Sequence, residues 1–446
     1  MKPLSNPNPH RASRRDFLKL SASLATLGLA GMHPARAAQA GDYKALVCVF
    51  LMGGNDGNNL IVPLEAERYA AYQALRGGLA LTGAELLAPI ADAQGEAYAL
   101  HHGLAELNPL YDAGHLAVVL NTGLLHRPLT RAEYLQGLGK PANLFSHSDQ
   151  TVQAQTGVPT PDGTGWGGRL LDCFGTADSL GAVSVASPSL FLQGLDTAGN
   201  VIAPGTTLSL SGMSLWPQSA ATARRQAVDA ILTQDGGNPL RQAANQAFAD
   251  GLQLAATLQG AGNLPPLSTP FPGTSIGNQL QEVARLVRLR AQMGPGRQVF
   301  FCTLGGFDTH GGQAWQQWYL LSQLSQALAA FHQAMQETGL AQQVTAFTQS
   351  EFGRTLQPSG SGSDHGWGNH QLVLGGAVQG GIHGQMPEFA LGGPDDAGSR
   401  GVWIPTLATA QFGATLGRWF GASAAELAWA FPGLGQFPMA DVGFML

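Results

Sequence analysis

The sequence predicts an α/β fold with a mostly parallel central sheet, and three observations support this prediction. Four apolar runs rich in β-forming residues lie at 46–52, 116–120, 299–304 and 344–348, which is typical of strands buried on both faces. Stretches at 276–293 and 315–338 repeat apolar residues every three or four positions, the period of an amphipathic helix. Strands and helices alternate along the chain, which favours a parallel sheet covered by helices.

The predicted strands end in polar residues. Asp56 follows the first run, Asp308 the third and Glu351 the fourth, with glycine or serine close by in each loop. In open α/β sheets, ligands bind outside the carboxyl ends of the strands. The sequence therefore predicts a functional site in the loops that hold these three acids.

Changes in composition indicate the domain organisation. One large domain is expected over 44–446, with an insertion or cap at about 182–264. This insertion combines short β-like pieces, such as 206–210, with a polar helical stretch at 220–259. The segment 260–275 is rich in proline, glycine, serine and threonine, and is expected to connect the insertion back to the core.

Residues 1–37 have the pattern of a twin-arginine signal peptide. The motif SRRDFLK at 13–19 precedes an apolar run at 20–32 and the small-residue sequence ARA at 35–37, so we expect cleavage after Ala37. The apolar run is shorter than the roughly 20 residues that span a bilayer, which argues against a permanent membrane anchor. We therefore predict a periplasmic protein that the twin-arginine translocase exports after folding; an ordinary secretory signal is the alternative.

Charge and cysteine content exclude several classes of function. The signal carries six basic residues and one acidic residue, so its removal changes the net charge from −6 to −11. An acidic surface without a basic stripe makes nucleic acid an improbable partner. Cys48, Cys173 and Cys302 are widely spaced and are expected to be buried small apolar residues, not a disulfide framework or a zinc knuckle.

The stretch 348–370 concentrates side chains that bind metals. It contains two acids, two histidines and an arginine: Glu351, Asp364, His365, His370 and Arg354. Carboxylates and imidazoles together suit zinc, manganese or iron, and with more oxygen ligands magnesium or calcium. An Asp–His pair alone is as often only a turn. Convergence with Asp56, Asp308 and His310 favours a hydrolytic site with divalent metal ions, in which several carboxylates neutralise the cations.

Ser146 is the candidate nucleophile. It precedes a helical run that ends near Gly157, and a helix N-terminus beside metals favours an ionised hydroxyl that attacks phosphorus or sulfur. The alternative is a serine that only caps the helix. The neighbouring His147 and the later Arg354 are candidates for steadying the transferred group, and Arg354 could equally pair with Glu351.

Several motifs in order resemble one known family. They are GGNDG at 53–57, SH at 146–147, GWGGR at 165–169, LGGFDTH at 304–310, SEFGRT at 350–355 and DHG at 364–366. As a set they look like the domain-of-unknown-function 1501 family of exported bacterial proteins, which is similar to the alkaline phosphatase and sulfatase superfamily. The resemblance implies an alkaline-phosphatase-like three-layer α/β/α sandwich with a smaller inserted cap, and a site with two metals and a serine, threonine or cysteine nucleophile.

The resemblance also assigns expected roles to single residues. Asp56 resembles the first-strand aspartate that bridges the metals, and Ser146 falls where the nucleophile should follow. Asp308 resembles the aspartate after the Gly-Gly turn, but the superfamily's histidine four residues later is Gly312 here, while His310 lies two residues later. Glu351 stands where an Asp-His pair is more usual, so Asp364, His365 and His370 would supply the displaced ligands.

These observations favour an exported metal-dependent hydrolase of phosphate or sulfate esters. Two divalent ions, chosen among zinc, manganese, magnesium and calcium, and a small or polymer-borne ester substrate are implied. No cysteine lies in the Cys/Ser-x-Pro-x-Arg motif that sulfatases convert to an aldehyde, which disfavours that mechanism. One alternative is a non-catalytic metal-binding or scaffold protein of the envelope. Another, a nucleotide-binding turn at 53–57, lacks the G-x-G-x-x-G spacing.

Overall fold

The computed structural model describes residues 43–158, 160–175, 180–206, 216–234, 236–260, 264–290 and 296–446. The predicted signal peptide at 1–37 and its cleavage after Ala37 lie outside these residues, and so does most of the predicted β-like piece at 206–210. Within the described residues, no helix combines the length and apolar character that crossing a membrane requires.

Nine strands of the described part form one central sheet, in the order β11-β5-β10-β9-β1-β8-β6-β7, with β12 paired to β5. The pairs β1–β8, β1–β9 and β6–β8 are parallel, whereas β10 runs antiparallel to both β5 and β9. The strands are β1 (Lys44–Met52), β5 (Leu116–Gly123), β6 (Ala182–Ser184), β7 (Asn200–Val201), β8 (Arg297–Gly305), β9 (Val344–Ser350), β10 (Asn369–Gly375), β11 (Gly381–His383) and β12 (Leu407–Ala408).

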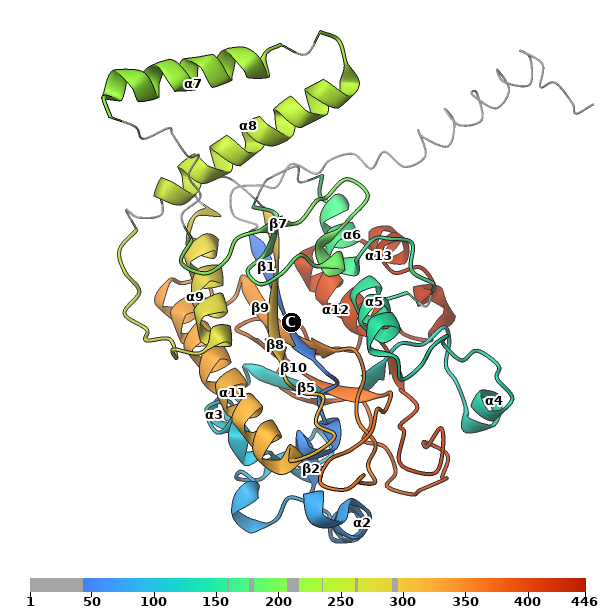
Figure 1. The fold of residues 1–446 in the computed structure, drawn as a ribbon. Coiled ribbons are helices and arrows are strands. Elements are labelled where there is room, and N and C mark those ends of the chain that lie inside the picture. The colour runs from blue at the N-terminus through green and yellow to red at the C-terminus, as the bar shows by residue number, and fades with distance from the viewer. Residues whose placement is uncertain are drawn as a thin grey trace, which may run out of the picture.

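Helices cover both faces of this sheet (Figure 1). One face packs against α9 and α11, and the other against α5, α6, α12 and α13. The α-helices are α2 (Ala66–Arg76), α3 (Asn108–Asp112), α4 (Arg131–Leu135), α5 (His147–Thr156), α6 (Trp166–Asp172), α7 (Gln218–Leu232), α8 (Pro239–Gly260), α9 (Ser275–Arg288), α11 (Gln313–Glu337), α12 (Thr409–Phe420) and α13 (Ala424–Ala430). The predicted three-layer α/β/α fold with a mostly parallel sheet is confirmed.

Strand β1 shows why its sequence is a continuous apolar run. Val47 and Val49 point into the core under α9 and α11, while Cys48 and Phe50 point into the core on the opposite face. Successive strand residues face opposite sides of a sheet, so a strand covered on both sides must be apolar at every position. The three cysteines are buried and unpaired, as the sequence predicts.

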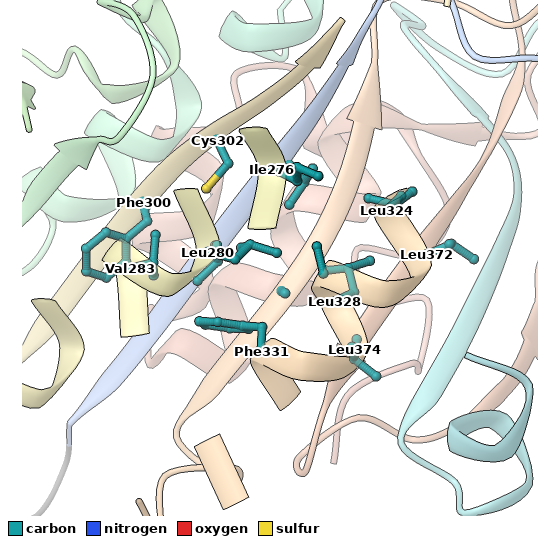
Figure 2. Close-up of a cluster of buried hydrophobic side chains, with 14 of the residues drawn as sticks. Ile276, Leu280, Val283, Phe300, Cys302, Leu324, Leu328, Phe331, Leu372 and Leu374 are labelled. Carbon is teal, nitrogen blue, oxygen red and sulfur yellow. The ribbon is translucent and has the colours of Figure 1, made fainter. Parts of the chain in front are cut away.

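The core between the sheet and its two long helices is shown in Figure 2. Leu280 of α9, Leu328 and Phe331 of α11, and Phe300 of β8 are all buried there and lie in one cluster. Close packing of this kind makes large-to-small substitutions cost about 2–5 kcal/mol each. The cluster thereby fixes α11 relative to β8, and the loop between them carries Asp308 and His310.

The region predicted as an insertion divides into two parts. Its first residues belong to the central sheet, because β6 pairs with β8 and β7 pairs with β6. Its later residues form α7 and α8, which stand away from the sheet (Figure 1). A small antiparallel sheet of β2 (Ile61–Pro63), β4 (Ala97–Leu100) and β3 (Ile90–Ala91) lies outside the main sheet, and the sequence analysis did not anticipate it.

Candidate metal centre

Three parallel strands deliver the loops of the site to one edge of the sheet. Met52 at the end of β1 pairs with Gly305 at the end of β8, and Leu51 pairs with Ser350 at the end of β9. Asp308 and Glu351 follow the two outer strands of this trio. Loops that are far apart in the sequence therefore meet, as the rule for parallel sheets predicts.

Gly53 brings the loop after β1 against the loop after β8. Its backbone has φ +114°, and a Cβ there would lie 2.3 Å from the Asp308 nitrogen. Its N–H donates to Glu351 Oε1 at 2.7 Å, and its carbonyl accepts from Arg354 Nη2 at 2.6 Å. Both the conformation and the close approach require glycine at this position.

Three imidazoles surround one carboxylate oxygen. Asp308 Oδ1 lies 3.0 Å from His310 Nε2, 3.4 Å from His365 Nε2 and 3.5 Å from His147 Nε2. We call these four residues the His–Asp cluster. Ligand atoms of His147, Asp308 and His365 all lie within 4.8 Å of one another. Nitrogen and oxygen ligands at roughly 2.0–2.1 Å in a tetrahedron are about 3.3 Å apart, so these spacings fit a single cation.

The tautomers of two histidines direct lone pairs into the His–Asp cluster. His365 Nδ1 lies 2.7 Å from the Phe145 carbonyl, and His147 Nδ1 lies 3.0 Å from Glu351 Oε1. Carbonyl and carboxylate oxygens accept hydrogen bonds, so both Nδ1 atoms carry protons, and in the neutral ring of each histidine Nε2 presents a lone pair. His147 Nε2 is buried and lacks a hydrogen-bond partner among the described residues. Metal-binding histidines are commonly oriented through their second nitrogen in this way.

Arg354 holds the carboxylate of the cluster. Its side chain is fully buried, and Nη2 lies 2.5 Å from Asp308 Oδ1. Burial by itself would raise the pKa of Asp308, but the hydrogen bond and charge of Arg354, helped by His310 and His147, leave that pKa below its ordinary value. Asp308 is therefore ionised at neutral pH. Three further Arg354 donors bind backbone carbonyls, so Arg354 positions Asp308, and its buried side chain has no free face for a substrate.

Asp364 lies outside the His–Asp cluster, next to His310. Its Oδ1 lies 3.5 Å from His310 Nδ1, and its second oxygen is paired with Arg400. The Arg400 hydrogen bond and charge lower the pKa of Asp364. Sequence reasoning missed Arg400, because nothing near 400 resembles a site motif; only the fold brings it to Asp364.

Two phenylalanines support the cluster, and neither was singled out from the sequence. The Phe352 ring lies 4.9 Å from that of His147 and 4.7 Å from that of His365, centroid to centroid. Phe145 has φ +75°, which is uncommon for a residue other than glycine, and its carbonyl orients His365. Burial is the main reason why the pKa of His365 is lowered, which favours its neutral form, the form that binds metals.

Ser146 is the N-cap of α5. Its Oγ accepts from the Asp149 N–H at 3.4 Å and donates to Asp149 Oδ2 at 2.5 Å. The hydroxyl thus caps the helix, which is the role that the sequence analysis gave as the alternative to a nucleophile. Its neighbours on both sides contact the cluster, Phe145 through His365 and His147 directly.

Asp56 and His370 have environments of their own. Asp56 is buried and bound by Arg76, by Gln313 and by the Asn58 N–H at 3.2 Å, so its oxygens are engaged in a protein network. His370 Nδ1 accepts from the Asn121 N–H at 2.9 Å, and burial lowers the pKa of His370 to about 4. The structure does not bring these two predicted ligands into the His–Asp cluster, whereas it does bring Glu351 and Asp364 to its rim.

The comparison with protein families decides the affiliation. The family described as "Protein of unknown function (DUF1501)" matches residues 43–399. The chain belongs to this family. No curated protein matches it. The similar solved structures include BT1596, a 2-O GAG sulfatase (11% identity, 87% of this chain and 72% of that chain, TM-score 0.34), and Ps i-CgsB in complex with k-i-k-neocarrahexaose (11%, 86% and 73%, TM-score 0.33).

Proposed function

We propose that this DUF1501 protein is an exported, metal-dependent hydrolase of phosphate or sulfate esters. The observation that carries the proposal is the convergence of three imidazole nitrogens on Asp308 Oδ1, at spacings that fit ligands of one cation. His147, His365 and Asp308 would hold a divalent ion, and His310 Nε2 lies beside this set, 3.0 Å from Asp308 Oδ1. Zinc and manganese suit this donor set best. A bound cation would polarise an ester oxygen or lower the pKa of water.

The protein's own side chains prepare the site for this chemistry. Glu351 and the Phe145 carbonyl hold the protons of His147 and His365 on the nitrogens that face away from the cluster. Arg354 keeps Asp308 ionised and in place. About half of the Asp308 and His310 side-chain surface remains exposed, so an ester group from solvent can reach the cluster.

In this proposal Ser146 attacks the ester and Asp149 receives its proton. The hydroxyl already donates to Asp149 Oδ2, and the two residues next to Ser146 in the chain, Phe145 and His147, contact or belong to the cluster. The serine oxygen would form a bond to phosphorus or sulfur while the bond to the alcohol oxygen breaks, and the proton on Asp149 would pass to that leaving oxygen. Water would then break that bond and restore the serine, so the overall reaction is hydrolysis.

Metal content and ester hydrolysis of the mature protein test the proposal. Elemental analysis should find about one equivalent of a divalent ion, and p-nitrophenyl phosphate or sulfate should be hydrolysed with added zinc, manganese, magnesium or calcium. Ser146→Ala should abolish hydrolysis and retain the metal, while Thr151→Ala, further along the same helix, should retain both. Protein with far less than one equivalent after growth in metal-rich medium would contradict the metal site.

A second candidate is a non-catalytic metal-binding scaffold of the envelope. The observation that favours it is the hydroxyl of Ser146, which serves as a helix cap and is shared with Asp149 of its own turn. In that case metal would bind and His365→Ala would remove it. Ser146→Ala would then change only stability, by about 1 kcal/mol for a lost cap.

The export part of the proposal depends on the motif at 13–19, where Arg14 and Arg15 form the pair. Replacing both arginines with lysine should leave the precursor in the cytoplasm, as fractionation and immunoblotting would show. A double-lysine variant that still reaches the periplasm would favour the ordinary secretory route.

A further inference from the structure

Three aromatic side chains lie on the solvent side of α11, although side chains of this size are normally buried. Trp315 is 64% exposed, Tyr319 47% and Trp318 38%. The buried face of the helix is formed by Gln313, Gln317 and the leucines that continue into the core. Positions 315, 318 and 319 are on the opposite side of a 3.6-residue helix, so these rings contribute little to the core.

Each of the three rings stacks on a neighbouring ring. Trp315 and Tyr319 stack with centroids 5.4 Å apart and planes within 5°. Trp318 stacks on His102, with centroids 6.2 Å apart and planes within 17°. Stacked rings at i and i+4 present flat apolar faces whose conformational freedom is already reduced. A ligand that binds them therefore immobilises little additional side chain.

The aromatic face begins in the first turn of α11, directly after the loop that carries Asp308 and His310. The first turn of α11 is bound to the loop that carries Asp364 and His365: the Gly312 N–H donates to Ser361 Oγ and the Gln313 N–H to the Ser361 carbonyl, both at 3.0 Å. Trp315 belongs to this first turn, five residues after His310. A polymer lying on the rings would thus extend toward the candidate metal centre.

The few charged residues of α11 restrict the classes of ligand that this face can bind. Helix α11 contains no lysine or arginine, and Glu337 at its end is its one acidic residue. On the following turns the solvent side carries the amide of Gln326 and the hydroxyl of Ser322, which donates to the Trp318 carbonyl at 2.7 Å. Nucleic acids and membrane surfaces are bound through basic residues, which this face lacks. Flat rings with neutral hydrogen-bonding groups match the C–H faces and hydroxyls of sugar rings.

We infer that Trp315, Trp318 and Tyr319 form a saccharide-binding platform that takes uncharged stretches of a polysaccharide. A polysaccharide bound on this platform would carry the ester that is hydrolysed at the His–Asp cluster, and this part of the inference rests on the proposed function. Sugar rings stack on the exposed faces of Trp315 and Tyr319, and the chain leads an ester group to the His–Asp cluster. Binding itself needs no metal.

Affinity electrophoresis of the mature protein tests the platform. Native gels that contain soluble starch, xylan or hydroxyethylcellulose should retard the wild-type protein in at least one case. Trp315→Ala and Tyr319→Ala should each weaken this retardation about fivefold or more, the scale of losing one stacked ring. The control Phe248→Ala removes an exposed aromatic ring from α8 and should behave as wild type; circular dichroism checks that each variant is folded.

The outcomes separate this inference from the proposed function. Retardation of protein that has no esterase activity even with added zinc, manganese, magnesium or calcium would support the platform while the proposed hydrolase fails. Esterase activity on p-nitrophenyl substrates without retardation by any of the three polysaccharides would overturn the platform alone. Retardation that is unchanged in both variants, or binding only to phosphatidylglycerol vesicles, would also overturn it.

Discussion

Two acids that follow neighbouring strands have opposite environments. Asp56 comes after β1, is 1% exposed, and is surrounded by Arg76, Gln313 and Asn58. Asp308 comes after β8, is 48% exposed, and faces three imidazoles besides Arg354. Both carboxylates are paired with arginine, so the arginine does not distinguish them. The oxygens of Asp56 are bound by side chains that enclose them, whereas Asp308 is half exposed and lies among imidazole nitrogens that could bind a cation with it.

The largest effect is expected from replacing Asp56, the buried acid of this comparison. Asp56→Ala should lower the free energy of unfolding by about 3–5 kcal/mol, because Arg76 would remain buried without its counter-charge. Chemical denaturation measures this loss. Asp56→Asn, which keeps the shape and an acceptor oxygen, should cost less. A stable Asp56→Ala protein that has lost its metal would instead make Asp56 a ligand.

Asp308→Asn should have the opposite effects, a large loss of metal affinity and a small loss of stability. Metal affinity should fall by more than the roughly 10–100-fold that outer-shell partners cost, because a ligand itself is lost. The unfolding free energy of the metal-free protein should change by only about 1 kcal/mol, since asparagine still accepts the Arg354 hydrogen bond. Isothermal titration with zinc and denaturation of the same preparation provide the two values. Unaltered zinc affinity would remove Asp308 from the proposed site.

Gly53→Ala tests how the two loops are held together. A Cβ at φ +114° and 2.3 Å from the Asp308 nitrogen should force the loops apart and cost about 1–3 kcal/mol. Zinc affinity should fall with it. Gly78→Ala is the matched control, since a Cβ there meets nothing within 4 Å. Equal zinc affinity in Gly53→Ala and wild type would mean that this contact does not shape the cluster.

The smallest effect concerns a buried histidine outside the cluster. Burial first, and then the nearby His115, lower the pKa of His332 to about 4. The unfolded chain takes up a proton near the ordinary pKa of about 6.5, so acid favours unfolding as the pH falls from there to about 4. His332→Gln should flatten this loss by up to about 1 kcal/mol per pH unit. Denaturation at several pH values measures the slope, and an unchanged slope would contradict the assignment.

Sequence reasoning identified β1, β5, β8 and β9 of the central sheet and the residues of the cluster because their signals are local, but it missed the other five strands of that sheet. The run at 46–52 is apolar at every position, and this matches β1, whose side chains are buried on both faces. Asp308, Glu351 and Asp364 stand out as acids in a chain with only 12% charged residues. The small sheet of β2, β3 and β4 was missed because strands of two to four residues leave too short a pattern.

The sequence by itself determined the fold class and the residues that could bind a metal, because strand periodicity and residues at strand ends are properties of neighbouring positions. The tertiary structure decided which of these residues meet. Arg76 from α2 binds Asp56, while the neighbouring order β9-β1-β8 brings Glu351 and Asp308 to His147. These contacts join positions far apart in the chain. Whether a carboxylate becomes a ligand or a buried anchor depends on side chains that only folding brings to it.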